Sequence, residues 1–136
     1  MDVYRGRIRR AAEVESRGEL MRREKVPGIA LPAVEPDSVY GLRFGGYISV
    51  PDDGVYTFRL TSDDGSLLRF GGAVVLDNDG AHGPLSKTVD VPLAKGLHPF
   101  EVVYFQAGGG SALQLEALDE NGTFGPLPPG SVRRVR

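Results

Sequence analysis

The chain has no cysteine and no tryptophan among its 136 residues. The lack of cysteine excludes disulfide bonds, cysteine-ligated zinc and thiol catalysis. No run of about twenty apolar residues occurs, so we expect no membrane-spanning helix. The formal net charge is only −2, which argues against nucleic acid as the main partner.

Catalytic signatures are missing from the sequence as well. It contains neither a Gly-x-Ser-x-Gly nucleophile turn nor a His-Glu-x-x-His zinc motif. For His98, at the start of a predicted strand, we expect a structural hydrogen bond. The adjacent carboxylates Asp63 and Asp64 do not match the pair that glycosidases place about 5 Å or more apart across a cleft. We therefore expect that the chain is not an enzyme.

Short apolar runs separated by glycine and proline make up most of the chain, with 19 Gly and 10 Pro in all. This punctuation is typical of an all-β domain. Between residues 55 and 62, apolar and polar side chains alternate with the period of a half-buried strand. The spacing predicts an antiparallel β-sandwich or barrel of roughly nine or ten strands, folded as a single domain over residues 1–136.

Residues 1–39 have a different composition from the rest. A first strand is predicted over residues 3–8, and residues 11–25 are rich in helix-forming side chains. Gly18 interrupts this stretch and its apolar stripe is weak, so we expect only a short helix or an irregular excursion. At the other end of the chain, a last short strand is predicted over residues 132–135.

Two adjacent carboxylates, Asp63 and Asp64, stand where one predicted strand hands over to the next. Side-by-side hard oxygen ligands suit calcium better than zinc. A solvated turn is the alternative, and the chain supplies its own control, because residues 52–54 repeat the same Asp-Asp-Gly tripeptide in an ordinary turn.

Two further loops carry oxygen donors. Residues 77–80 (Asp-Asn-Asp-Gly) resemble half of a helix-loop-helix calcium loop, but the required ligand positions fall on Val75 and Ser86. A β-turn is therefore the preferred interpretation, with the possibility that this loop lies beside Asp63 and Asp64. The glycine run at residues 108–110 frees backbone carbonyls to face a cation, with Gln106 as a neutral ligand; a plain hairpin loop explains the glycines equally well.

Several motifs in a fixed order together resemble the protective-antigen-type (PA-14) domain family. The match covers about residues 40–130, and the Tyr4-Arg5-Gly6 start is similar to the family's first strand. The motifs are Phe44-Gly45-Gly46-Tyr47-Ile48, Pro51-Asp52-Asp53-Gly54-Val55-Tyr56, Thr61-Ser62-Asp63-Asp64-Gly65-Ser66, Asp77-Asn78-Asp79-Gly80, Gly96-Leu97-His98-Pro99 and Tyr104-Phe105-Gln106-Ala107-Gly108-Gly109.

The resemblance implies a secreted or cell-surface β-module of the kind found in bacterial glycoside hydrolases, adhesins, toxins and yeast cell-wall lectins. In the lectin members, two consecutive aspartates joined by a cis peptide hold calcium, which in turn holds vicinal sugar hydroxyls. These aspartates correspond to Asp63 and Asp64. The second ligand loop corresponds to Gln106 and to backbone carbonyls near Gly108 and Gly110.

The sequence thus predicts a non-catalytic, calcium-dependent, lectin-like module that binds carbohydrate. The loop at residues 77–83 is expected to form one wall of the site, with Asn78 and His82 near the sugar. We also expect the chain to be part of a larger secreted protein with neighbouring domains. The alternative is a structural accessory module of a glycoside hydrolase or surface protein, with no ligand of its own.

Overall fold

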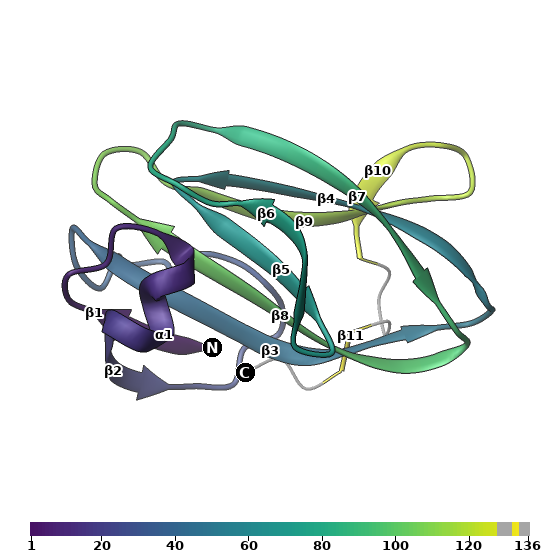
Figure 1. Ribbon diagram of the computed structural model, residues 1–136, viewed down its shortest axis with the longest axis horizontal. Helices are drawn as coiled ribbons and strands as arrows, with labels where there is room; N and C mark the ends of the chain where they lie inside the picture. The colour runs from purple at the N-terminus through teal and green to yellow at the C-terminus, as the bar shows by residue number, and fades with distance from the viewer. Residues whose placement is uncertain (128–131, 134–136) are drawn as a thin grey trace.

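The computed structural model describes residues 1–127 and 132–133, and it shows two antiparallel β-sheets (Figure 1). In the large sheet the strands run in the order β2 (Glu19–Arg23), β1 (Asp2–Arg5), β3 (Tyr40–Val50), β8 (Gly96–Gln106), β5 (Ser66–Phe70) and β6 (Ala73–Asn78), with β11 (Val132–Arg133) also pairing with β3. In the small sheet they run in the order β10 (Phe124–Pro126), β9 (Ala112–Leu118), β4 (Gly54–Asp63) and β7 (Leu85–Leu93). The described strands form an open sandwich, so the all-β antiparallel prediction is confirmed.

Alternating apolar side chains build the core between the two sheets. The longest pairing joins β3 to β8, and it places the buried Phe44 opposite the buried Val102. Across the sandwich, the Phe58 ring of the small sheet lies 5.5 Å from the Phe70 ring, which lies 6.4 Å from the Phe100 ring. Burial of these large rings dominates the stabilisation of such a core.

The N-terminal excursion forms a second, smaller apolar cluster on the outer face of the large sheet. The excursion contains the 3₁₀ turn η1 (Ala11–Glu13) and the single-turn helix α1 (Val14–Arg17). Val14 packs directly over Gly41, where an added Cβ would lie 2.6 Å from a Val14 methyl group. The short helix agrees with the prediction, but the helix-like composition beyond Gly18 forms strand β2 instead, because those residues pair with β1.

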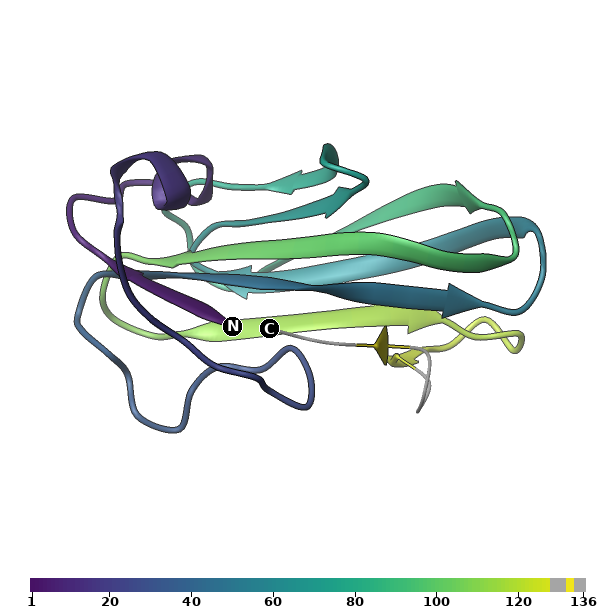
Figure 2. The same ribbon diagram turned by 90° about the horizontal axis from the view of Figure 1, so that it is seen from below.

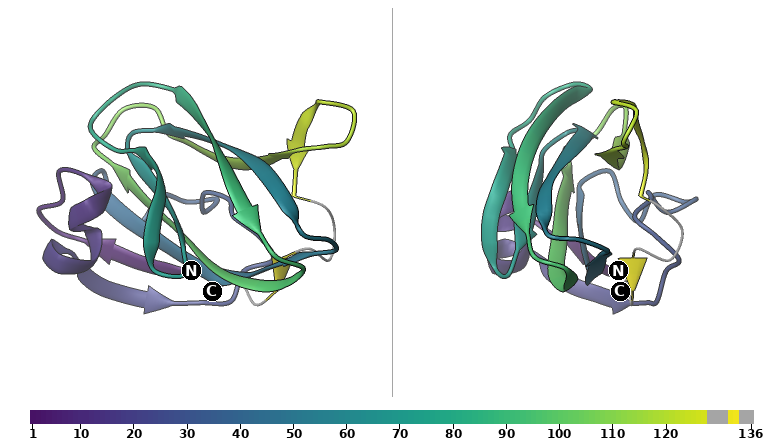
Figure 3. Two further views of the ribbon diagram at one scale, coloured as in Figure 1. Left: turned by 45° about the vertical axis from the view of Figure 1, so that its right-hand side comes forward. Right: turned by 90° about the vertical axis from the view of Figure 1, so that its right-hand side faces the viewer.

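The excursion and the β9–β10 hairpin lie at opposite ends of the sandwich (Figures 1, 2 and 3). The loops that carry the predicted ligands gather at the same end as α1. The predicted last strand is present as β11 over Val132–Arg133, and its remaining residues lie outside the described part of the chain. No helix in the described residues is long and apolar enough to cross a membrane.

Candidate functional site

Asp64 joins three loops at one end of the sandwich. This side chain is only 7% exposed, and it lies in the corner between β4 and β5. One carboxylate oxygen, Oδ1, accepts a hydrogen bond from the backbone N–H of His82 (3.1 Å), and Oδ2 accepts one from the backbone N–H of Ala107 (2.8 Å). The loop after β6 and the loop after β8 are therefore both held against the Asp-Asp corner.

Asp63 is fixed through its backbone and leaves its carboxylate available. The buried Tyr104 hydroxyl donates a 2.5 Å hydrogen bond to the Asp63 carbonyl oxygen, and the Asp63–Asp64 peptide bond is cis. None of the described residues donates a hydrogen bond to the Asp63 carboxylate. A Cβ added to Gly110 would lie 3.3 Å from Asp63 Oδ2, so this carboxylate borders the glycine loop directly.

Gly65 allows the loop after β6 to approach the corner closely. A Cβ at Gly65 would lie 2.5 Å from Asp79 Oδ1 and 2.7 Å from the backbone nitrogen of Gly80. Asp79 in turn accepts hydrogen bonds from the backbone N–H groups of Ala11 (2.6 Å) and Ala12 (3.0 Å). The N-terminal excursion is thus tied to the site through one side chain, a role that the sequence reasoning missed.

Gln106 shapes the glycine loop from behind. Its side chain is fully buried, and its Nε2 group donates to the carbonyl oxygens of Gly109 (3.2 Å) and Gly110 (3.0 Å). Gly108 and Gly109 have φ angles of 107° and 78°, which only glycine adopts without strain. The structure therefore places Gly110 beside Asp63 and Gln106 behind the glycine loop, whereas a Cβ added to Gly108 would approach the Ser38 carbonyl oxygen (3.9 Å). In this structure Gln106 positions carbonyls, and its role as a cation ligand stays a prediction.

The side chains of Asn78 and His82 contact backbone carbonyl oxygens around the loop after β6. Asn78 is fully buried behind the site, and its Nδ2 group donates to the carbonyl oxygens of Leu60 (3.2 Å) and Leu85 (2.8 Å). The ring nitrogens of His82 lie 2.7 Å from the Gly83 carbonyl oxygen and 2.8 Å from the Asn78 carbonyl oxygen. Their predicted contact with a ligand therefore stays a prediction, while their observed contacts order the loop that Asp64 holds.

The pKa values of Tyr104 and His82 are shifted at the corner formed by Asp63 and Asp64. Burial raises the pKa of the Tyr104 hydroxyl, and the nearby charges of Asp64 and Asp63 raise it further. At His82, burial lowers the pKa, but the two carbonyl contacts and the charges of Asp64 and Asp63 outweigh it, so the pKa is raised overall. The pKa of both groups is therefore raised, mainly by burial at Tyr104 and by the carbonyl contacts at His82, and the two carboxylates add to the shift in each case.

The donors at this corner suit a hard cation. No group of three or more acidic, histidine or cysteine side chains occurs among the described residues, so a metal here would have two carboxylates supplemented by backbone and amide oxygens. An oxygen-only set is what calcium takes, whereas zinc prefers nitrogen and sulfur ligands. Asp63, with no hydrogen-bond donor, borders the loop whose Gly109 and Gly110 carbonyls are already oriented, so the residues present fit calcium.

The fold and this loop cluster define an all-β module with an oxygen-rich site at one end. The PA14 domain family model matches residues 32–123, which is more than half of the chain. The chain belongs to the PA14 domain family. No curated protein matches it.

Solved structures agree with this assignment. The chain is similar to the PA14 sugar-binding domain from an RTX adhesin, with 28% identity and a TM-score of 0.58, covering 65% of this chain and 50% of that one. It shares its fold with the PA14 domain of the MpAFP antifreeze protein, with 21% identity and a TM-score of 0.60. That match covers 70% of this chain and 53% of the other. The chain also shares its fold with an anti-sigma factor domain-containing protein, with 17% identity, a TM-score of 0.66 and coverage of 75% and 36%. The matched region spans about half or less of each of these chains.

Proposed function

We propose that this chain is a non-catalytic carbohydrate-binding module whose site depends on calcium. The observation that carries the proposal is that Asp64 joins three loops at one end of the sandwich. In this arrangement the Asp63 carboxylate borders the glycine loop beside Gly110. The similarity to a sugar-binding PA14 domain from an adhesin supports carbohydrate as the ligand class. We further propose that the module acts on the outside of the cell, within a larger protein.

Each residue has a distinct task in this proposal. Asp63 and Asp64 would supply the charged ligands, and the carbonyls of the glycine loop, near Gly108 and Gly110, would supply neutral ones. Gln106 keeps the Gly109 and Gly110 carbonyls oriented through its amide nitrogen, which costs them only one of two lone pairs. A bound calcium ion would offer its remaining coordination positions to vicinal hydroxyl groups of a sugar.

The first test is calorimetric titration with calcium. The wild-type chain is expected to bind one calcium ion with micromolar or weaker affinity, because only two carboxylates contribute charge. The variant Asp63→Ala, Asp64→Ala should lose this binding, whereas the matched variant Asp52→Ala, Asp53→Ala should keep it. Wild-type protein that binds no calcium at millimolar concentration would overturn the proposed mechanism.

The second test concerns the ligand. On a glycan array, the wild-type chain is expected to bind in calcium more strongly than in chelator, and the Asp63→Ala, Asp64→Ala variant should show no such difference. Calcium binding with no calcium-dependent glycan signal would contradict the carbohydrate part alone. If both tests failed, a structural accessory module would be the better description.

A further inference from the structure

A second groove lies on the outer face of the large sheet, away from the loop cluster. Its volume is about 710 Å³, within the range of pockets that hold small molecules. Tyr47 and Gly45 of β3, Pro99 and Glu101 of β8, and the Gly71-Gly72 turn line it. Pro99 of this groove is eight residues before Ala107, whose N–H group donates to Asp64. In an extended strand this separation corresponds to about 26 Å.

Strand pairing explains why the face is hollowed here. Tyr47 lies opposite Pro99, and Gly45 lies opposite Glu101, so no side chain on β3 fills the space between Arg43 and Tyr47. The backbone N–H of Gly71 donates to the Pro99 carbonyl oxygen (3.1 Å), which fixes the turn between β5 and β6 along the other side. Backbone pairing therefore sets the floor of the groove, and the side chains of Lys25, Arg43, Tyr47 and Glu101 complete its lining.

Tyr47 supplies an aromatic surface in this groove. Its side chain is 42% exposed, in contrast to the fully buried Tyr40 and Tyr104. An aromatic ring with one apolar face and a polar tip suits a ligand that is itself amphipathic. A pyranose ring is such a ligand, since its C–H groups present an apolar face and its hydroxyls form the edge.

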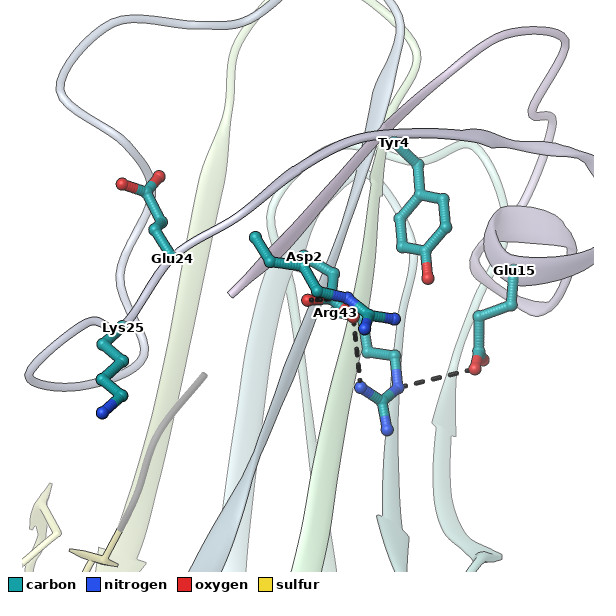
Figure 4. Close-up of a pocket in the computed structure, with 7 residues that line it drawn as sticks. Asp2, Tyr4, Glu15, Glu24, Lys25 and Arg43 are labelled. Carbon is teal, nitrogen blue, oxygen red and sulfur yellow. Dashed lines mark hydrogen bonds and ion pairs between the residues drawn. The ribbon is translucent and has the colours of Figure 1, made fainter.

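A fixed pair of charges stands at the other end of the groove. Arg43 forms an ion pair with Glu101 through Nη2. Its Nη1 and Nε pair with Asp2 (3.4 Å) and Glu15 (3.5 Å), and Figure 4 shows these two contacts. All three guanidinium nitrogens of Arg43 are thus engaged, but Nη1 and Nη2 each carry a second N–H, and the Glu101 carboxylate accepts more than one hydrogen bond. The pair can therefore donate to and accept from hydroxyl groups without losing its own contacts.

We propose that this groove is a second carbohydrate subsite, which stacks a pyranose ring on Tyr47 and binds its hydroxyls through Arg43 and Glu101. It works without calcium and without Asp63 or Asp64, so it goes beyond the function proposed above. Two sites on one module would let a single glycan chain, or two neighbouring chains, be held more strongly than by either site alone. The recessed glycines make the face concave, which suits a sugar ring better than the broad surface of another protein.

The test uses the full chain carrying Asp63→Ala and Asp64→Ala, in chelator, on an array of neutral and acidic glycans. The glycan that gives the strongest signal is then titrated by NMR, with the Tyr47 ring signals followed. Adding Tyr47→Ala should weaken binding about tenfold or more, as expected for an exposed aromatic anchor. Tyr47→Phe should retain it, and Glu101→Gln, a change of charge with little change of shape, should weaken it.

Val74→Ala is the matched control. Val74 is 51% exposed and pairs with Arg69, an outer-face residue, but it does not line the groove. Its removal should leave binding unchanged. An array without any signal in chelator overturns the subsite, and so does binding that Tyr47→Ala leaves intact. Because calcium is absent throughout, these results do not depend on the calcium site.

Discussion

The chain contains the tripeptide Asp-Asp-Gly twice, at residues 52–54 and 63–65, and the two copies differ sharply in their surroundings. In both, a tyrosine hydroxyl donates a 2.5 Å hydrogen bond to the first aspartate's carbonyl oxygen, from Tyr56 in one case and Tyr104 in the other. The first copy is exposed throughout, and Asp53 makes one hydrogen bond, with the backbone N–H of Lys95 (2.7 Å). In the second, Asp64 is buried and holds two loops.

The same three residues therefore make a turn in one place and the centre of a site in the other. What differs is the number of other chain segments that converge on the tripeptide. The first is a reversal between two strands, whereas the second meets the loops after β6 and β8. A short motif gains chemical meaning from the backbone groups that the fold brings to it, and the four predictions below test this contrast.

Replacing the two glycines should give the largest difference. In Gly65→Ala the new Cβ would press on the backbone of Gly80, so we expect a loss of about 3 kcal/mol in the free energy of unfolding. In Gly54→Ala the nearest atom is a Tyr56 ring carbon at 3.7 Å, so the change should be about 0.5 kcal/mol or less. Urea denaturation of both variants measures the difference, and equal losses would contradict the contrast.

Replacing the second aspartate of each copy should come next. Asp64→Ala leaves the N–H groups of His82 and Ala107 without their acceptor, which should cost about 2 kcal/mol in metal-free buffer. Asp53→Ala removes one exposed hydrogen bond and should cost about 0.5 kcal/mol. Measurement without calcium separates this structural role from any metal binding. A fully stable Asp64→Ala variant would show that the two loops do not need this carboxylate.

Much of the fold could be predicted from the sequence because alternation within each strand is a local signal. Strand β2 could not, because its local composition favours a helix and only the pairing with β1 overrides it. Adjacency alone does not distinguish Asp63 and Asp64 from the pair at residues 52–53; the resemblance to the PA-14 family singles them out, and their role as cation ligands stays a prediction. The burial of Gln106 and Asn78 could not be predicted, since their amide nitrogens donate to carbonyl oxygens that only the folded chain brings near.

Asp79 shows the same limit most clearly. Besides the adjacent Gly80 N–H, its hydrogen-bond partners Ala11 and Ala12 lie 68 and 67 residues away along the chain, so no spacing rule connects them. In the sequence it belongs to a turn-like tetrapeptide that resembles half of a calcium loop. Its observed role, tying the N-terminal excursion to the site, depends entirely on tertiary structure.

Alkaline pH should distinguish the two tyrosine contacts. Because the pKa of Tyr104 is raised in the folded chain, its contribution to stability is complete below about pH 10 and is lost as the pH rises above it. Within that range the loss should approach about 1.4 kcal/mol per pH unit. Tyr104→Phe should flatten this decline, measured by urea denaturation at several pH values, whereas Tyr56→Phe should leave it unchanged. Part of the decline should persist in Tyr104→Phe, since burial raises the pKa of Tyr40 to about 12.

The smallest effect is expected where the second tripeptide depends on the N-terminal excursion. Asp79→Ala removes the acceptor for the Ala11 and Ala12 N–H groups, and by analogy with helix caps it should cost about 0.5–1 kcal/mol. Asp77→Ala, near the end of β6, serves as the control, because among the described residues its carboxylate accepts a hydrogen bond from the Asp79 backbone N–H alone. Amide exchange measured by NMR should quicken at Ala11 and Ala12 in Asp79→Ala but not in Asp77→Ala, because only the first variant frees those N–H groups. Unchanged exchange at both amides would mean that the excursion is held by its apolar contacts and by the ion pairs of Glu15 with Arg43 and Arg69, and that the site is independent of it.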